Sequence, residues 1–150
     1  MTASIRIRRP APSRQGMSES HMRQRVIQGL RSLDAVSVEN PARPGTPDVN
    51  YVEGWIELKQ LPRWPRGGPD EIVRVAHFRP GQRVWIGRRA RRGGRVHVLL
   101  QVGADWLLLP GEVAARELGR VSRARLEEMA VRVWVGGIDM KELKACLLGN

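Results

Sequence analysis

Residues 45–59 read Gly-Thr-Pro-Asp-Val-Asn-Tyr-Val-Glu-Gly-Trp-Ile-Glu-Leu-Lys, and this stretch is the most informative part of the sequence. Strand-forming residues lie on both sides of Glu53-Gly54, so the stretch predicts a hairpin of two short strands joined at that turn. Side chains alternate along a strand, and Glu57 and Lys59 therefore point to the same face.

Asp48 lies on or just before the first strand of this hairpin, where its carboxylate can approach Glu57 across the strand pair. Two carboxylates then converge, with the ammonium of Lys59 one pleat away. Carboxylate oxygens of this kind suit Mg²⁺ or Mn²⁺. A neighbouring lysine can hold or polarise a water molecule. Together these groups are the parts needed for metal-assisted phosphodiester hydrolysis.

Each of these residues also has a purely structural interpretation. Pro-Asp is a common turn pair, and an aspartate in a loop is usually solvated. A glutamate inside an apolar strand needs a partner, and a salt bridge between Glu57 and Lys59 would supply one. Asp70 follows Pro69 and repeats the Pro-Asp pair, but no E-x-K follows it, so it is not a candidate.

The spacing of Pro47-Asp48 and Glu57-Leu58-Lys59 resembles the PD-(D/E)XK nuclease superfamily. Gly45 before the pair, the strand-like Gly54-Trp55-Ile56 and a later helix containing Gln82 add to the resemblance. The stretches 61–65 and 77–85 look like those of small phage and prophage members. Those members are described as Holliday junction resolvase-like or virus-type replication-repair nucleases. The resemblance covers roughly residues 19 to 110.

This resemblance implies an α/β (α+β) fold with a restriction-endonuclease-like core. A mixed central β-sheet would be flanked by helices, in the order α-β-β-β-α-β-β followed by C-terminal helices. The metal ligands implied are Asp48, Glu57, the carbonyl of Leu58 and, as a supplementary acid in the first helix, Glu19. Lys59 would position the attacking water.

Gln82 is implied to contact a scissile phosphate or a metal-bound water. The alternatives for the two helical residues are ordinary ones. An acid such as Glu19 is favoured in a first turn by the helix dipole, and Gln82 can be a solvated helix residue.

The charge of the chain points to a polyanionic partner. Its 150 residues contain 26 Lys+Arg against 15 Asp+Glu, for a net charge of +11. Arginine binds phosphate through two parallel hydrogen bonds, so DNA is the expected partner. Arginines are densest at residues 88–92, and the alternative for this run is that it forms an ordinary solvated face. The predicted nucleic-acid contacts are Arg83, Arg88, Arg89, Arg91, Arg92 and Trp64, whereas Trp55, Trp85, Trp106 and Trp134 are predicted core residues.

Several classes of protein are excluded. With Cys146 as the single cysteine, no intramolecular disulfide and no cysteine-rich zinc site can form. No apolar run reaches the roughly 18 residues of a membrane span, and the basic N-terminus lacks the apolar segment of a secretory signal. A cytoplasmic protein, in the host cytoplasm if phage-encoded, is therefore expected.

Residues 1–16 predict a disordered basic arm, and residues 17–150 a single nuclease-like domain. Ser18 is the expected N-cap of a helix that runs to about Leu33. The further expected elements are strands at 37–39, 72–75, 95–102 and 105–109, a helix from Pro80 to about Gly93, and helices near 111–118, 122–131 and 139–148.

The sequence thus predicts a Mg²⁺- or Mn²⁺-dependent endonuclease that hydrolyses DNA phosphodiesters. By resemblance, branched or flapped DNA in phage replication or repair is the expected substrate, and a junction resolvase would be a homodimer. A non-catalytic DNA-binding module is the first alternative. A nuclease acting on RNA, or a nickase subunit that needs a partner, comes third.

Overall fold

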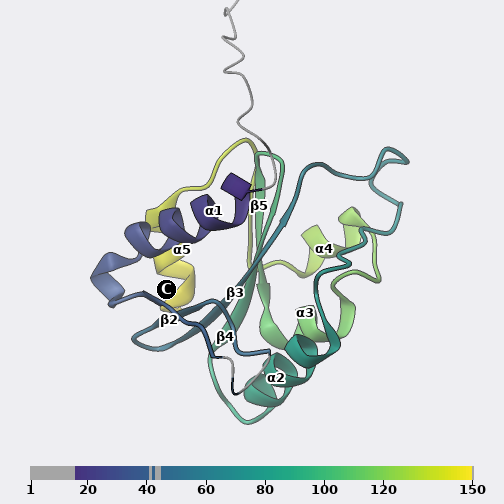
Figure 1. Ribbon diagram of the computed structural model, residues 1–150. Helices are drawn as coiled ribbons and strands as arrows, with labels where there is room; N and C mark the ends of the chain where they lie inside the picture. Colours follow the sequence, from purple (N-terminus) through teal and green to yellow (C-terminus); the bar gives the residue numbers. More distant parts are fainter. Residues whose placement is uncertain (1–15, 41, 43–44, 150) are drawn as a thin grey trace, which may run out of the picture.

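A six-stranded mixed sheet forms the centre of the molecule, with helices packed on both faces (Figure 1). The computed structural model describes residues 16–40, 42 and 45–149. Residues 1–15 of the predicted basic arm therefore lie outside the described residues. The class is α+β, as the sequence predicted.

The strands lie in the sheet in the order in which they occur along the chain. They are β1 (Val36–Ser37), β2 (Val49–Tyr51), β3 (Gly54–Leu61), β4 (Val96–Val102), β5 (Asp105–Pro110) and β6 (Arg132–Trp134). The helices are α1 (Gly16–Gly29), the short 3₁₀ helix η1 (Arg31–Leu33), α2 (Pro80–Arg91), α3 (Gly111–Glu117), α4 (Arg123–Met129) and α5 (Met140–Leu147).

One pair of strands differs from the rest. β3 and β4 run parallel, whereas all other neighbours in the sheet are antiparallel. Parallel neighbours require a long crossover connection, and residues 62–95, which include α2, provide it. This crossover places the N-terminus of α2 against the loop that leads into β2.

The alternation of side chains along the strands divides the core into two layers. Even positions of β3 and odd positions of β4 pack under α1 and α5, around Ile56 and Leu99. The opposite positions pack under α2, α3 and α4, around Val98 and Leu100. Figure 1 shows the two groups of helices on opposite sides of the sheet. Trp106 is 1% exposed and Trp134 and Trp85 are each 7% exposed, as predicted for core residues.

The predicted element order is confirmed through β5, with differences in detail. The hairpin turn is Val52-Glu53, one residue earlier than predicted, because Gly54 pairs with Tyr51. Ser18 does not cap the first helix, since α1 already begins at Gly16. That helix ends at Gly29, and a separate 3₁₀ turn leads to Asp34 in the left-handed region at φ 54°.

Two predicted extended segments are shorter in the structure, and one strand was missed. The expected strand at 37–39 is β1, at Val36–Ser37. The expected extended piece at 72–75 contributes a single bridge, from Ile72 to Ser122. β6 was not predicted, because three residues carry too little pattern to be read without the partner strand β5.

None of the helices in the described part of the chain is long and apolar enough to span a membrane.

His97 on β4 provides a test of the core. Its Nδ1 is buried without a hydrogen-bond partner, and burial followed by the charge of Arg95 lowers the pKa of His97 to about 4. Below pH 6.5 His97 therefore binds a proton in the unfolded chain more readily than in the folded chain. The free energy of unfolding consequently decreases as the pH is lowered.

We expect the step from pH 7 to pH 5 to remove up to about 2 kcal/mol through His97 alone. Urea unfolding of wild type and His97→Gln at both pH values measures this difference. Equal acid sensitivity of the two proteins would contradict the assignment.

Candidate functional site

The register of the β2–β3 hairpin places the two predicted acids opposite each other. Val49 pairs with Ile56, and continuing this antiparallel register by one residue sets Asp48 against Glu57. The Asp48 side chain then takes over from the backbone, because its Oδ2 accepts a hydrogen bond from the Leu58 N–H at 2.9 Å. Asp48 therefore ends the ladder and fixes its carboxylate beside Glu57.

Beyond this point one edge of β3 is open. β2 has three residues and β3 has eight, so the second half of β3 has no β2 partner. The N–H and C=O of one strand residue point the same way. Since the Leu58 N–H faces Asp48, the Leu58 carbonyl lies at the same open edge, where the sequence predicted a metal ligand.

The loop before β2 is held by close packing against α2. Gly45 has φ +97°, and a Cβ at this position would lie 2.5 Å from the carbonyl oxygen of Gly81 in the first turn of α2. Only glycine combines that conformation with that approach. Pro47 is buried next to it. The G-x-P-D segment thus brings Asp48 to the N-terminus of α2.

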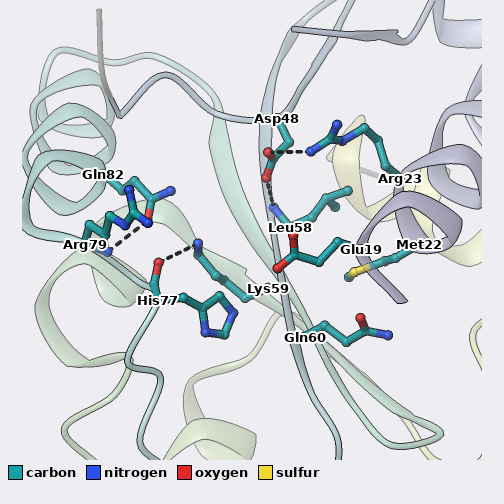
Figure 2. A pocket seen from close by; sticks show the side chains of 10 residues that line it. All are labelled: Glu19, Met22, Arg23, Asp48, Leu58, Lys59, Gln60, His77, Arg79 and Gln82. Carbon is teal, nitrogen blue, oxygen red and sulfur yellow. Dashed lines mark hydrogen bonds and ion pairs between the residues drawn. The ribbon is translucent and has the colours of Figure 1, made fainter. Parts of the chain in front are cut away.

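These elements surround a pocket of about 190 Å³ at the open edge of β3 (Figure 2). α1 forms one wall, and the segment from His77 into α2 forms the wall opposite. The strand residues lie between the two walls. The lining residues are Glu19, Met22, Arg23, Asp48, Leu58, Lys59, Gln60, His77, Arg79 and Gln82.

Glu57 does not line this pocket but is buried next to Asp48, at 1% exposure. Burial is the main cause that raises its pKa to about 10, and a hydrogen bond with Asp48 and the charge of Asp48 add to the effect. Its Oε2 is buried without a hydrogen-bond partner. Without a cation, Glu57 therefore holds a proton at neutral pH, and an unused oxygen remains beside Asp48.

Lys59 is buried in the same place, at 5% exposure. Its Nζ donates to the carbonyl of His77 at 3.0 Å, and the Nζ lies 5.7 Å from the centre of the Phe78 ring. Burial lowers the pKa of Lys59, opposed by the charges of Glu57, Asp48 and Glu19. Among the described residues, Lys59 and Glu57 do not form a direct ion pair. The salt bridge given as the structural interpretation of these two described residues is therefore absent.

The donors fit a hard divalent cation. Among the described residues no three His, Cys, Asp or Glu side chains form a group that could hold a metal. The available set is instead two carboxylates and one backbone carbonyl. Mg²⁺ commonly binds through one or two carboxylates and keeps several waters, which substrate oxygens can replace. The unpartnered Glu57 Oε2 is the observation that favours a cation here.

Two further predicted residues also line the pocket. Glu19 is exposed on α1 and extends toward β3 (Figure 2). Gln82 lies on the opposite wall, where its Oε1 accepts a hydrogen bond from the Arg79 N–H at 2.9 Å and so caps α2. The side-chain NH₂ of Gln82 remains available to the pocket. The predicted catalytic and metal-binding residues therefore line this pocket except for Glu57, which is buried beside Asp48.

The predicted nucleic-acid contacts divide into two groups. Arg88, Arg89, Arg91 and Arg92 are exposed around the C-terminal end of α2, and the Arg89 guanidinium also lies 4.5 Å from the centre of the Trp85 ring. Arg83 instead points inward, as described below.

Trp64 is also engaged within the protein. Its indole N–H donates to Asp105 at 2.9 Å, and the Arg123 guanidinium lies 4.4 Å over its ring. A base could stack on the face that Arg123 covers only if that guanidinium left the ring.

The sequence also pointed to His77 and Arg79 as possible phosphate contacts, and both line the pocket, whereas Arg23 was missed. For Arg23 the sequence did hold a signal, because it follows Glu19 by four residues and so shares its helix face. A second feature, a groove of about 450 Å³ between α2 and α3, was also missed. Its arginines are Arg83, Arg91, Arg116 and Arg120.

No protein-family model matches this chain, and no curated protein matches it significantly. The function is therefore inferred from the chemistry of the pocket and its surroundings.

Arg83 and Arg88 make a matched pair for testing structural against exposed arginines. Arg83 donates to the carbonyls of Ala115 and Leu118 and lies 4.4 Å from the Phe78 ring centre. We expect Arg83→Gln to lower the free energy of unfolding by about 2–3 kcal/mol, because two partly buried acceptors lose a charged donor. Arg88→Gln should change it by less than about 0.5 kcal/mol. Chemical denaturation measures both, and equal effects would refute the distinction.

Glu57 provides a second test. A carboxyl whose folded pKa exceeds its unfolded pKa reduces stability once the pH rises above about 4.5. Glu57→Gln should therefore raise the free energy of unfolding at pH 7.5 in EDTA, by about 1–3 kcal/mol. The same substitution should remove any stabilisation by Mn²⁺. The exposed Glu39→Gln is the control, and a destabilised Glu57→Gln protein would show that the carboxyl has another role.

Proposed function

We propose that this chain is a divalent-cation-dependent endonuclease that hydrolyses DNA phosphodiesters on a core of the PD-(D/E)XK type. One observation supports this most. The carboxyls of Asp48 and Glu57 lie within hydrogen-bonding reach of each other beside the buried Lys59, and Glu57 Oε2 has no hydrogen-bond partner. A domain that only contacts phosphates has no use for two carboxylates on its binding face.

Asp48, Glu57 and the Leu58 carbonyl would hold Mg²⁺ or Mn²⁺, with Glu19 as a supplementary ligand from α1. Such a cation, when bound, lowers the pKa of a water and neutralises charge that develops at the phosphorus. Asp48 suits this role because the Leu58 N–H fixes its carboxylate at 2.9 Å. Glu57 suits it because its second oxygen has no competing hydrogen bond.

Lys59 would orient the attacking water and stabilise charge on the phosphoryl oxygens. The carbonyl of His77 holds its Nζ in a fixed place, so little reorganisation is needed when substrate enters. Burial lowers the pKa of Lys59, which makes transfer of a proton from its Nζ easier than for a solvated lysine. Gln82 on the opposite wall would donate its NH₂ group to a phosphate oxygen or to a water.

The arginines at the C-terminal end of α2 would bind the DNA backbone away from the pocket. α2 rises about 1.5 Å per residue, which puts Arg88 to Arg92 roughly 9–15 Å from Gln82. A nucleic-acid strand that runs along α2 would reach both places. The net charge of +11 supports such a contact, and so does the exposure of Arg88, Arg91 and Arg92.

Branched or flapped DNA in phage replication or repair is the substrate class that the sequence resemblance suggests. Cleavage of both strands at a junction needs two active sites, so a homodimer belongs to that version of the proposal.

A non-catalytic nucleic-acid-binding module is the second candidate. The observation in its favour is that the exposed arginines of α2 lie outside the carboxylate pocket. Such a module would bind DNA equally well with Mg²⁺ or EDTA, and salt would weaken that binding strongly.

Cleavage of labelled flapped, four-way-junction, single-stranded and supercoiled DNA tests the proposal. We expect cutting with Mg²⁺ or Mn²⁺ and none with EDTA. Asp48→Asn and Lys59→Met should each lower the rate by at least about 10²-fold, because each removes a group that acts on the transition state.

Asp70→Asn is the matched control, since Asp70 is exposed and forms the other Pro-Asp pair. It should cut at the wild-type rate. Normal cutting by Asp48→Asn, or binding without cutting on every substrate, would reject the nuclease assignment.

A further inference from the structure

Arg23 lies in the candidate site without a role in the proposed reaction. It extends from α1 into the pocket, where one of its terminal nitrogens is 3.4 Å from Asp48 Oδ1 (Figure 2). About a third of the Arg23 side chain is exposed, against a quarter of the Asp48 side chain. The guanidinium is thus positioned between solvent and the carboxylate that would bind the cation.

The contact between the two residues is loose. A charge-assisted N–H···O hydrogen bond is usually about 2.7–2.9 Å long, shorter than the 3.4 Å found here. Asp48 keeps its better hydrogen bond for the Leu58 N–H, at 2.9 Å. The Nε of Arg23 is buried and has no hydrogen-bond partner. Arg23 therefore has unused donors inside the pocket.

The charges around the pocket favour an anionic occupant. Arg23, Lys59 and Arg79 bring three cationic groups, from α1, β3 and the start of α2 respectively. Lys59 donates to a carbonyl rather than to a carboxylate. Asp48 and Glu19 are the acidic side chains that line the pocket, while Glu57 is buried and does not line it. Binding of a divalent cation to Asp48 would leave the positive groups in excess.

We propose that Arg23 binds the substrate phosphate and rests on Asp48 only while the cation is absent. This inference depends on the proposed function, since it assigns a substrate contact to the same pocket. A cation held by Asp48 would compete with the guanidinium for the carboxylate and would repel it. Arg23 then turns to a phosphate oxygen, which its planar fork fits. Cation binding and substrate binding are coupled through this one side chain.

The coupling predicts two effects of opposite sign for Arg23→Gln. The affinity for Mn²⁺ rises on the order of tenfold, because a competing positive charge leaves Asp48. The affinity for DNA falls roughly tenfold when Mn²⁺ is present, because a charged phosphate contact is lost. In EDTA the DNA affinity changes little, since Arg23 is then held by Asp48.

Mn²⁺ binding is measured by the rise in unfolding temperature across a concentration series. DNA binding is measured by fluorescence anisotropy with a labelled duplex, with and without Mn²⁺, in a Lys59→Met background that does not cut. The unfolding temperature in EDTA shows that each variant is folded. Arg23→Lys keeps the charge but loses the fork, so it should retain the wild-type Mn²⁺ affinity and lose part of the DNA affinity.

Arg25→Gln is the matched control. Arg25 lies two residues further along α1, with its guanidinium 5.6 Å from the Trp106 ring centre, and it does not line the pocket. Its substitution should leave the Mn²⁺ affinity unchanged and shift the DNA affinity equally with and without the cation.

Weaker Mn²⁺ binding by Arg23→Gln would mean that Arg23 merely supports Asp48, and would overturn the inference. So would an equal loss of DNA affinity with and without Mn²⁺, which is the sign of general attraction. Wild type that gains no stability from Mn²⁺ would reject the nuclease proposal itself. The two failures are therefore distinguishable.

Discussion

The hydrogen bond from the Leu58 N–H to the Asp48 carboxylate is the interaction on which the rest of the site depends. It closes the β2–β3 ladder with a side chain where a backbone carbonyl would otherwise continue it. Because β2 ends there, the second half of β3 keeps an open edge inside the fold. A sheet edge normally needs cover, and here α1 and the start of α2 provide it while leaving a pocket between them.

The pocket concentrates groups that work against stability. Glu57 and Lys59 are the buried charged residues in the described part of the chain, and each loses solvation there. Buried ionisable groups of this kind cluster at functional sites. The two large cores on either side of the sheet offset this cost, since the central strands β3, β4 and β5 are covered on both faces.

The arginines show that residue type alone does not settle a role. Arg83 and Arg89 both lie on α2. Arg83 donates to a carbonyl of α3, whereas Arg89 lies over a tryptophan ring. Arg91, also on α2, lines the groove together with Arg116 of α3 and Arg120 of the turn that follows α3. A surface that carries several arginines is therefore assembled from more than one segment of the chain. Some arginines of the run serve the fold instead.

The sequence by itself determined the hairpin, the shared face of Glu57 and Lys59, and the approach of Asp48, because these follow from the two-residue period of a strand and one tight turn. It also determined the helix that begins at Pro80, since proline suits a first helical turn.

The structure was needed to show that Arg23 and His77 line the pocket. It was also needed to show that Trp64 and Arg83 make hydrogen bonds within the protein, and that β6 exists. Those features depend on contacts between segments far apart in the chain. No local period or turn signal encodes such contacts.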